Sequence, residues 1–151
     1  MSELMDLYQE VILDHNKHQR NFGQIEAADH CARGDNPLCG DQLTLYLRMD
    51  GDRVAEVRFE GQGCAISTAS ASILTEIVLG KTLEEVDALF ESFHELLTGD
   101  PSVAAEAGPE LGKLAVFAGV REFPVRVKCA TLAWHTLKAA ISDGGEAAST
   151  E

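Results

Sequence analysis

The feature that most constrains this chain is an alternation of apolar and polar side chains over residues 43–49 and again over residues 55–60. Leucine recurs at every second position from Leu43 to Leu47, and the same alternation resumes over residues 55–60. Asp50-Gly51 lies between the two runs and supplies the residues that a tight hairpin turn prefers. A period of two is typical of strands with one buried face, so the sequence predicts a β-hairpin that packs against other elements.

Helical spacing of apolar residues surrounds this hairpin. Thr82 is followed three residues later by Glu85, which is a capping-box pattern, and Pro124 suits the first turn of a helix. Residues 16–36 are polar and glycine-containing, so we expect mostly loop there, with a short strand near residues 30–33. The predicted helices cover the start of the chain to about His15, Cys64 to Gly80, Thr82 to Gly99, a short stretch at 110–118, and 124–141.

Composition excludes several classes of function. The chain has 151 residues, the size of one domain, and its 12 basic against 25 acidic residues give a net charge of −13. Such a surface repels phosphate backbones and anionic lipid, so we expect neither nucleic acid nor membrane as a partner. No apolar run reaches the length of a membrane span, and the start MSELMDLYQE is acidic. We therefore expect a cytoplasmic protein.

Cysteine usage is the first indication of chemistry. In a reducing cytosol, Cys31, Cys39, Cys64 and Cys129 are expected to be metal ligands, nucleophiles or buried apolar side chains rather than disulfides. Cys39 precedes the first strand of the hairpin and Cys64 follows the second, so antiparallel pairing brings both to one end of the sheet. Cys129 joins them if the last helix packs with its N-terminus at that end.

With Asp41, these three cysteines would form a tetrahedral set suited to Zn²⁺. The helix that follows Cys64, together with Arg126 and Lys128, could offset the negative charge of such a site. No two of the cysteines are spaced as in a zinc knuckle, however, and each on its own also suits a small side chain in the core. Residue spacing alone leaves both interpretations open.

Three longer segments carry a resemblance to a known family. They are NPLCGD at 36–41, GQGCAISTASAS at 61–72 and VRVKCATLAWHTL at 125–137, and together they resemble the U-type iron–sulfur cluster assembly proteins. The resemblance extends from the first helix to about Ile141. It is closer to the SufU branch than to the IscU branch. In the IscU branch, a histidine precedes the last cysteine ligand, where this chain has Lys128. The segment that corresponds to the one between Cys64 and Cys129 is also shorter in the IscU branch than in this chain.

This resemblance implies a fold, a metal and a partner. The fold would be α+β, a compact SufE/IscU-like sandwich of a three-stranded antiparallel sheet and about five to six helices, with one zinc-binding domain at 1–142 and a flexible tail at 143–151. The implied Zn²⁺ ligands are Cys39, Asp41, Cys64 and Cys129. Cys39 would also accept persulfide sulfur from a pyridoxal-phosphate cysteine desulfurase of the SufS type and relay it to a downstream iron–sulfur assembly scaffold.

Other interpretations remain. The same cysteines could instead hold an iron–sulfur cluster on a scaffold, or zinc in a purely structural domain. Arg126 could steady a thiolate or be a solvated cation. The acidic helix face between Glu84 and Glu95 could be a solvated surface or a docking surface for a basic partner. We expect Cys31, which lies outside the three segments, to be half-buried and without a role at the site.

Overall fold

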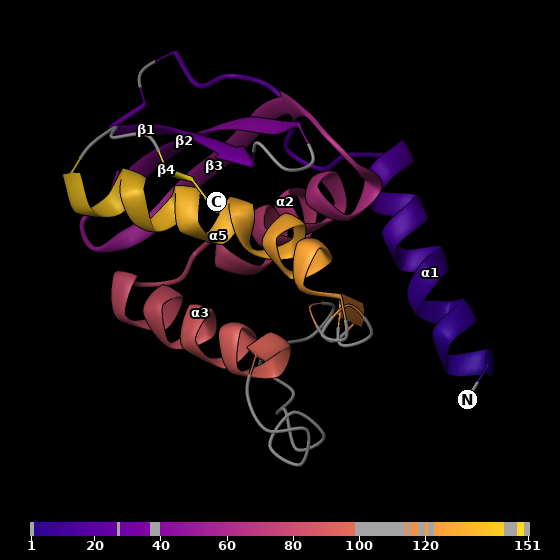
Figure 1. The fold of residues 1–151 in the computed structure, drawn as a ribbon. Coiled ribbons are helices and arrows are strands. Elements are labelled where there is room, and N and C mark those ends of the chain that lie inside the picture. The colour runs from indigo at the N-terminus through magenta and orange to yellow at the C-terminus, as the bar shows by residue number, and fades with distance from the viewer. Residues whose placement is uncertain are drawn as a thin grey trace.

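A computed structural model describes residues 2–26, 28–36, 40–98, 114, 116–117, 120, 123–143 and 148–149. Figure 1 shows the arrangement of its helices and strands. In chain order these are α1 (Ser2–Lys17), β1 (His30–Asn36), β2 (Asp41–Asp50), β3 (Arg53–Gln62), α2 (Ala65–Val78), α3 (Leu83–Thr98), α5 (Pro124–Asp143) and β4 (Ala148–Ser149).

The sheet has the order β3-β2-β1-β4. β2 and β3 form the predicted antiparallel hairpin, in which Leu45 pairs with Phe59, and the turn glycine Gly51 has a φ of 64°. β1 pairs antiparallel with β2, from His30 opposite Leu47 to Asn36 opposite Asp41. The prediction of a three-stranded antiparallel sheet is therefore confirmed. The two-residue β4, which runs parallel to β1, is an addition that the sequence pattern did not indicate.

β1 is longer than the strand predicted at residues 30–33. Its second half contains Gly34, which lies so close to α5 that a Cβ atom there would overlap the Thr136 hydroxyl and crowd Leu132. The close approach of a helix, rather than an alternation of apolar and polar residues, thus accounts for the burial of Gly34, whereas Asp35 beside it is exposed.

The helices form layers beneath the sheet. In Figure 1, α2 and α5 lie along one face of the sheet, and α3 lies on the far side of α5. Leu45 and Leu47 of β2 point into this interior and are fully buried, as the alternation predicted. Between α3 and α5, the Phe93 ring lies 5.7 Å from the Trp134 ring, centroid to centroid, and both side chains are fully buried. One continuous core therefore connects the sheet to the outer helix.

A buried histidine holds α1 against α2. His15 is fully buried, and its Nδ1 shares a 2.8 Å hydrogen bond with Ser72 Oγ. Its Nε2 lies 3.5 Å from Glu76 Oε1. The end of α1 is consequently fixed by polar contacts with the middle of α2.

The number of helices differs from the prediction. The described part of the chain contains four α-helices, so the expected five to six are not matched. The helix predicted at 110–118 falls mostly outside the described residues, and those described there, Leu114 and 116–117, have 3₁₀ geometry. The division into a domain at 1–142 and a tail at 143–151 stays a prediction. Within the described ranges, no helix is both long and apolar enough to cross a membrane.

The start of α3 has the predicted capping box. The Thr82 backbone N–H donates to Glu85 Oε1 at 2.9 Å, and the Glu85 N–H donates to Thr82 Oγ1 at 3.2 Å. These two bonds satisfy backbone donors that the first turn of a helix leaves without partners. The acidic side chains of Glu84, Asp87 and Glu91 are exposed. Their exposure suits both a solvated surface and a docking surface for a basic partner.

Candidate metal centre

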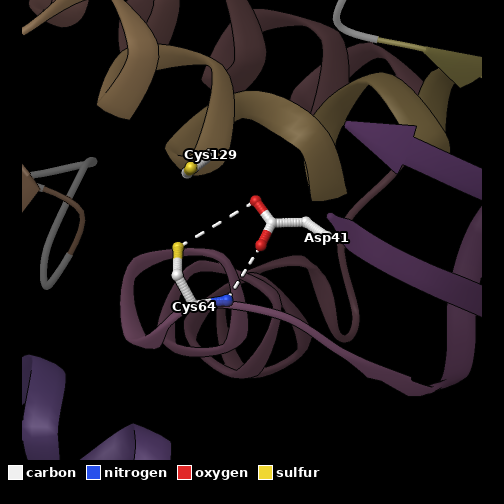
Figure 2. A group of neighbouring side chains, drawn as sticks. All are labelled: Asp41, Cys64 and Cys129. Carbon is white, nitrogen blue, oxygen red and sulfur yellow. Dashed lines mark hydrogen bonds between the residues drawn. The ribbon is translucent and has the colours of Figure 1, made fainter. Parts of the chain in front are cut away.

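Three of the four predicted metal ligands converge at one end of the sheet. The ligand atoms of Asp41, Cys64 and Cys129 all lie within 4.8 Å of one another. Figure 2 shows how these three side chains face one another. Asp41 is the first residue of β2, Cys64 is the N-cap of α2, and Cys129 lies in the second turn of α5. Segments far apart in the sequence thus meet at one end of the sheet, whereas the predicted place of Cys39 beside Cys64 stays a prediction.

Asp41 is fully buried because it lies on the same face of β2 as the core leucines. Its Oδ1 accepts a 2.8 Å hydrogen bond from the backbone N–H of Cys64, and its Oδ2 lies 3.9 Å from Cys64 Sγ. The carboxylate is thereby held against the loop between β3 and α2, with Oδ1 toward the backbone N–H of Cys64 and Oδ2 toward its Sγ.

Cys64 caps the N-terminus of α2. Its backbone is extended, with a φ of −70° and a ψ of 167°, and its Sγ accepts from the Ser67 N–H at 3.4 Å. The positive end of a helix dipole favours a negatively charged group at this position, including a thiolate. Gly63, just before it, leaves room for the carboxylate, because a Cβ at Gly63 would lie 2.6 Å from Asp41 Oδ1.

Cys129 is fully buried and is linked to Asp41 through Asn36. The Asn36 side-chain amide is also fully buried, and its Nδ2 lies 3.3 Å from Asp41 Oδ2 and 3.6 Å from Cys129 Sγ. Asn36 opens the segment NPLCGD, but no role was predicted for it from the sequence. The only available signal was its position opposite Asp41 across the loop, which requires the β1–β2 pairing to be known.

Cys39 lies outside the described residues, so its place as a fourth ligand stays a prediction. The residues on both sides of its loop are described. The Gly40 backbone N–H donates to the Asn36 carbonyl at 2.9 Å, and Asn36 and Asp41 are the last cross-strand pair. Residues 37–40 therefore connect two adjacent strand ends, and Asp41 follows Cys39 by only two positions.

The donor set fits zinc. Zn²⁺ takes thiolate sulfur at about 2.3 Å and carboxylate oxygen at about 2.0–2.2 Å, in tetrahedral sites of four ligands. Two cysteine sulfurs and one carboxylate within 4.8 Å supply three such ligands, and they lie in a largely buried setting. The same soft sulfur ligands also suit iron, so the geometry does not choose between the two metals.

The other candidate residues are Cys31, Arg126 and Lys128. Cys31 is half-buried on the face of the sheet opposite the helices, and burial, together with the nearby Glu60 carboxylate, raises the pKa of its thiol. A thiol with a raised pKa is a poor nucleophile at neutral pH. Near the start of α5, Arg126 is exposed and Lys128 half-buried.

Comparison with known proteins gives a consistent picture. Residues 7–130 match the family described as NifU-like N terminal domain. The chain is 41% identical over 147 residues to the iron-sulfur cluster assembly scaffold protein IscU of Streptococcus pyogenes serotype M1, covering 97% of this chain and 90% of that protein. It is 38% identical over 149 residues to the zinc-dependent sulfurtransferase SufU of Bacillus subtilis (strain 168), covering 95% and 97%.

A solved structure has the same fold. It is the structure of a candidate iron-sulfur cluster assembly scaffold protein for the SUF system from Fervidobacterium islandicum AW-1. It superposes with a TM-score of 0.78 at 38% identity, covering 88% of this chain and 95% of that one.

Proposed function

The chain belongs to the family of NifU-like N-terminal domains, in which its relatives are iron–sulfur cluster assembly proteins, and from this premise we propose that it is a zinc-dependent sulfurtransferase. It accepts persulfide sulfur on Cys39 from a pyridoxal-phosphate cysteine desulfurase of the SufS type. It then relays this sulfur to a downstream assembly scaffold. The chemistry needs free thiols, so we place it in the reducing cytosol.

The observation that carries this proposal is the convergence of Asp41, Cys64 and Cys129 within 4.8 Å, beside the loop that contains Cys39. These residues would hold Zn²⁺, with Cys39 as the fourth ligand. When bound, Zn²⁺ keeps its cysteine ligands deprotonated at neutral pH. The B. subtilis relative named as a zinc-dependent sulfurtransferase adds support, since the chain matches it along nearly its whole length.

The transfer itself is a thiol–disulfide type exchange. The Cys39 thiolate attacks the outer sulfur of the partner's persulfide and forms a new sulfur–sulfur bond. The sulfur–sulfur bond of the partner breaks, and its electron pair leaves with the partner's cysteine as a thiolate, so no oxidant is required. Asp41 anchors one end of the Cys39 loop, because its Oδ1 is fixed by the Cys64 N–H at 2.8 Å.

Replacement of the acceptor tests this assignment. We expect Cys39→Ser to abolish persulfide formation on the chain after incubation with desulfurase and cysteine, as measured by thiol-specific labelling and mass spectrometry. The matched control is Cys31→Ser, because Cys31 lies on the other face of the sheet and should leave labelling unchanged. Undiminished labelling of Cys39→Ser would refute the role of Cys39.

A second candidate function is a scaffold that assembles an iron–sulfur cluster on the same cysteines. The S. pyogenes relative, named as a scaffold protein, favours it at 41% identity. Metal analysis of the chain purified without added iron, followed by a desulfurase turnover assay, separates the two. Zinc with stimulated turnover supports the sulfurtransferase, whereas a coloured cluster that passes to an apo-acceptor supports the scaffold. Zinc without stimulation would indicate a purely structural site.

A further inference from the structure

We propose that Asn36 is a positioning residue of the metal centre, whose side-chain amide holds Asp41 and Cys129 in their ligating arrangement. This inference rests on the zinc site of the proposed function and adds a residue to it. Asn36 does not act as a ligand. It acts through the two ligands that its amide nitrogen contacts.

The fold places the Asn36 side chain between two elements that each supply a ligand. Asn36 ends β1 and pairs with Asp41 at the start of β2, and both side chains are buried on the helix-covered side of the sheet. Its Nδ2 lies 3.3 Å from Asp41 Oδ2 and 3.6 Å from Cys129 Sγ of α5. A single NH₂ group thus connects a strand ligand to a helix ligand, and the helix ligand Cys129 lies 93 residues after Asn36.

The chemistry of the contacts fixes the orientation of this amide. An amide nitrogen donates two hydrogen bonds, which matches the carboxylate oxygen and the sulfur that face it. The reverse orientation would bring the amide oxygen against Asp41 Oδ2, and two acceptors repel each other at that distance. The donor therefore faces both ligands.

The amide oxygen of Asn36 shows that fold stability alone does not account for an asparagine at this position. Asn36 is fully buried, and its Oδ1 has no hydrogen-bond partner among the described residues. An unpaired buried carbonyl opposes folding, whereas leucine has a similar shape and no polar atom to leave unpaired. What asparagine supplies and leucine lacks is the NH₂ group toward the two ligands. Hydrogen bonds from outside the coordination sphere orient metal ligands and tune their affinity.

Asn36→Leu tests the inference directly. We expect its zinc affinity, measured by competition with a chromophoric chelator, to fall by about 10- to 100-fold. The thiolate-to-cobalt absorption bands of the Co²⁺-loaded variant should change as well, because the ligand geometry changes. The thermal midpoint of the metal-free variant should stay equal to that of the unmodified chain or rise, since the unpaired carbonyl is gone.

The matched control is Thr136→Val, which removes a buried hydroxyl that donates to the Leu132 carbonyl in the same helix as Cys129. Its zinc affinity and cobalt spectrum should match those of the unmodified chain. If Asn36→Leu does not fold, Asn36→Ala provides the same comparison with a smaller side chain.

The outcomes distinguish the two proposals. Equal zinc affinity of Asn36→Leu and the unmodified chain overturns the role of Asn36 but leaves the zinc site intact. An equal loss of zinc affinity in Thr136→Val also overturns the role of Asn36, because removal of any buried polar group in this region would then have the same effect. Failure of the unmodified chain to bind zinc overturns the proposed function together with this inference.

Discussion

At the scale of single residues, the geometry of the candidate metal centre depends on the small size of a neighbouring glycine. Gly63 lies directly against the Asp41 carboxylate, and its missing Cβ is what allows Asp41 Oδ1 to reach the Cys64 N–H at 2.8 Å. Gly63 is not among the residues with positive φ, so its backbone does not itself demand glycine. The requirement comes from contact with the ligand.

Gly63→Ala should therefore weaken the metal centre without unfolding the chain. A Cβ at this position would lie 2.6 Å from Asp41 Oδ1, so the carboxylate has to leave the position it occupies beside the sulfur ligands. We expect zinc affinity to fall about tenfold or more, with an unchanged far-ultraviolet circular dichroism spectrum. Gln62→Ala is the control, because Gln62 is the exposed neighbour. Unchanged zinc affinity in Gly63→Ala would show that the ligand does not depend on this contact.

At the scale of elements, the face of the sheet opposite the helices has its own polar network between β2 and β3. The Tyr46 hydroxyl donates to Glu60 Oε1 at 2.6 Å, and Gln24 Nε2 donates to the same oxygen at 2.9 Å. Burial, and then the hydrogen bond and the charge of Glu60, raise the pKa of Tyr46 to about 12. The same hydrogen bonds lower the pKa of Glu60.

This cross-strand pair predicts a pH dependence. Because the folded pKa of Tyr46 lies above the usual value of about 10, the pair stabilises the fold fully below pH 10 and loses this effect as the pH rises toward about 12. Absorbance at 295 nm in a Tyr8→Phe background should give a midpoint near 12 for Tyr46. Glu60→Gln should move the midpoint toward 10 only in part, since burial is the larger cause. A midpoint near 10 in the Tyr8→Phe background would contradict the network.

Local patterns were sufficient to predict most elements, because those elements arise from neighbouring residues. The alternation around Leu45 predicted β2, and Thr82 with Glu85 predicted the start of α3. The second half of β1 was missed because its glycine, Gly34, is buried by α5, which lies far away in the sequence. The role of Asn36 was missed for the same reason, since its contact with Cys129 spans 93 residues.

At the scale of the whole molecule, the candidate metal centre joins β2, α2 and α5, which also meet through apolar packing and through a buried hydrogen bond from the Ser70 hydroxyl of α2 to the Ala130 carbonyl of α5. The convergence of Asp41, Cys64 and Cys129 could be predicted from the hairpin topology and the resemblance together. Spacing alone could not predict it, because no two ligands are near neighbours at the spacing of a zinc knuckle. A set of ligands that come from three elements is brought together only when the chain adopts its tertiary structure.

Removal of zinc should therefore destabilise the whole chain. A ligand that binds only the folded state raises the free energy of unfolding by about 2.7 kcal/mol at a free concentration 100 times its dissociation constant. We expect urea unfolding with and without excess chelator to differ by about this amount. We expect this difference in the free energy of unfolding to disappear in Asp41→Ala and to remain in Cys31→Ser. The same difference in both variants would mean that zinc binds elsewhere.

The position of Asp41 on β2 has a consequence for the gene. The aspartate and the leucines from Leu43 to Leu47 share one side of the strand only because they are separated by even numbers of residues. One extra codon between Asp41 and Leu43 would turn either the aspartate or the leucines toward solvent. Extra codons within 37–40 leave the spacing on both strands unchanged. Changes of length that preserve the core and keep Asp41 on the buried side of β2 are thus confined, in this part of the reading frame, to the few codons around Cys39.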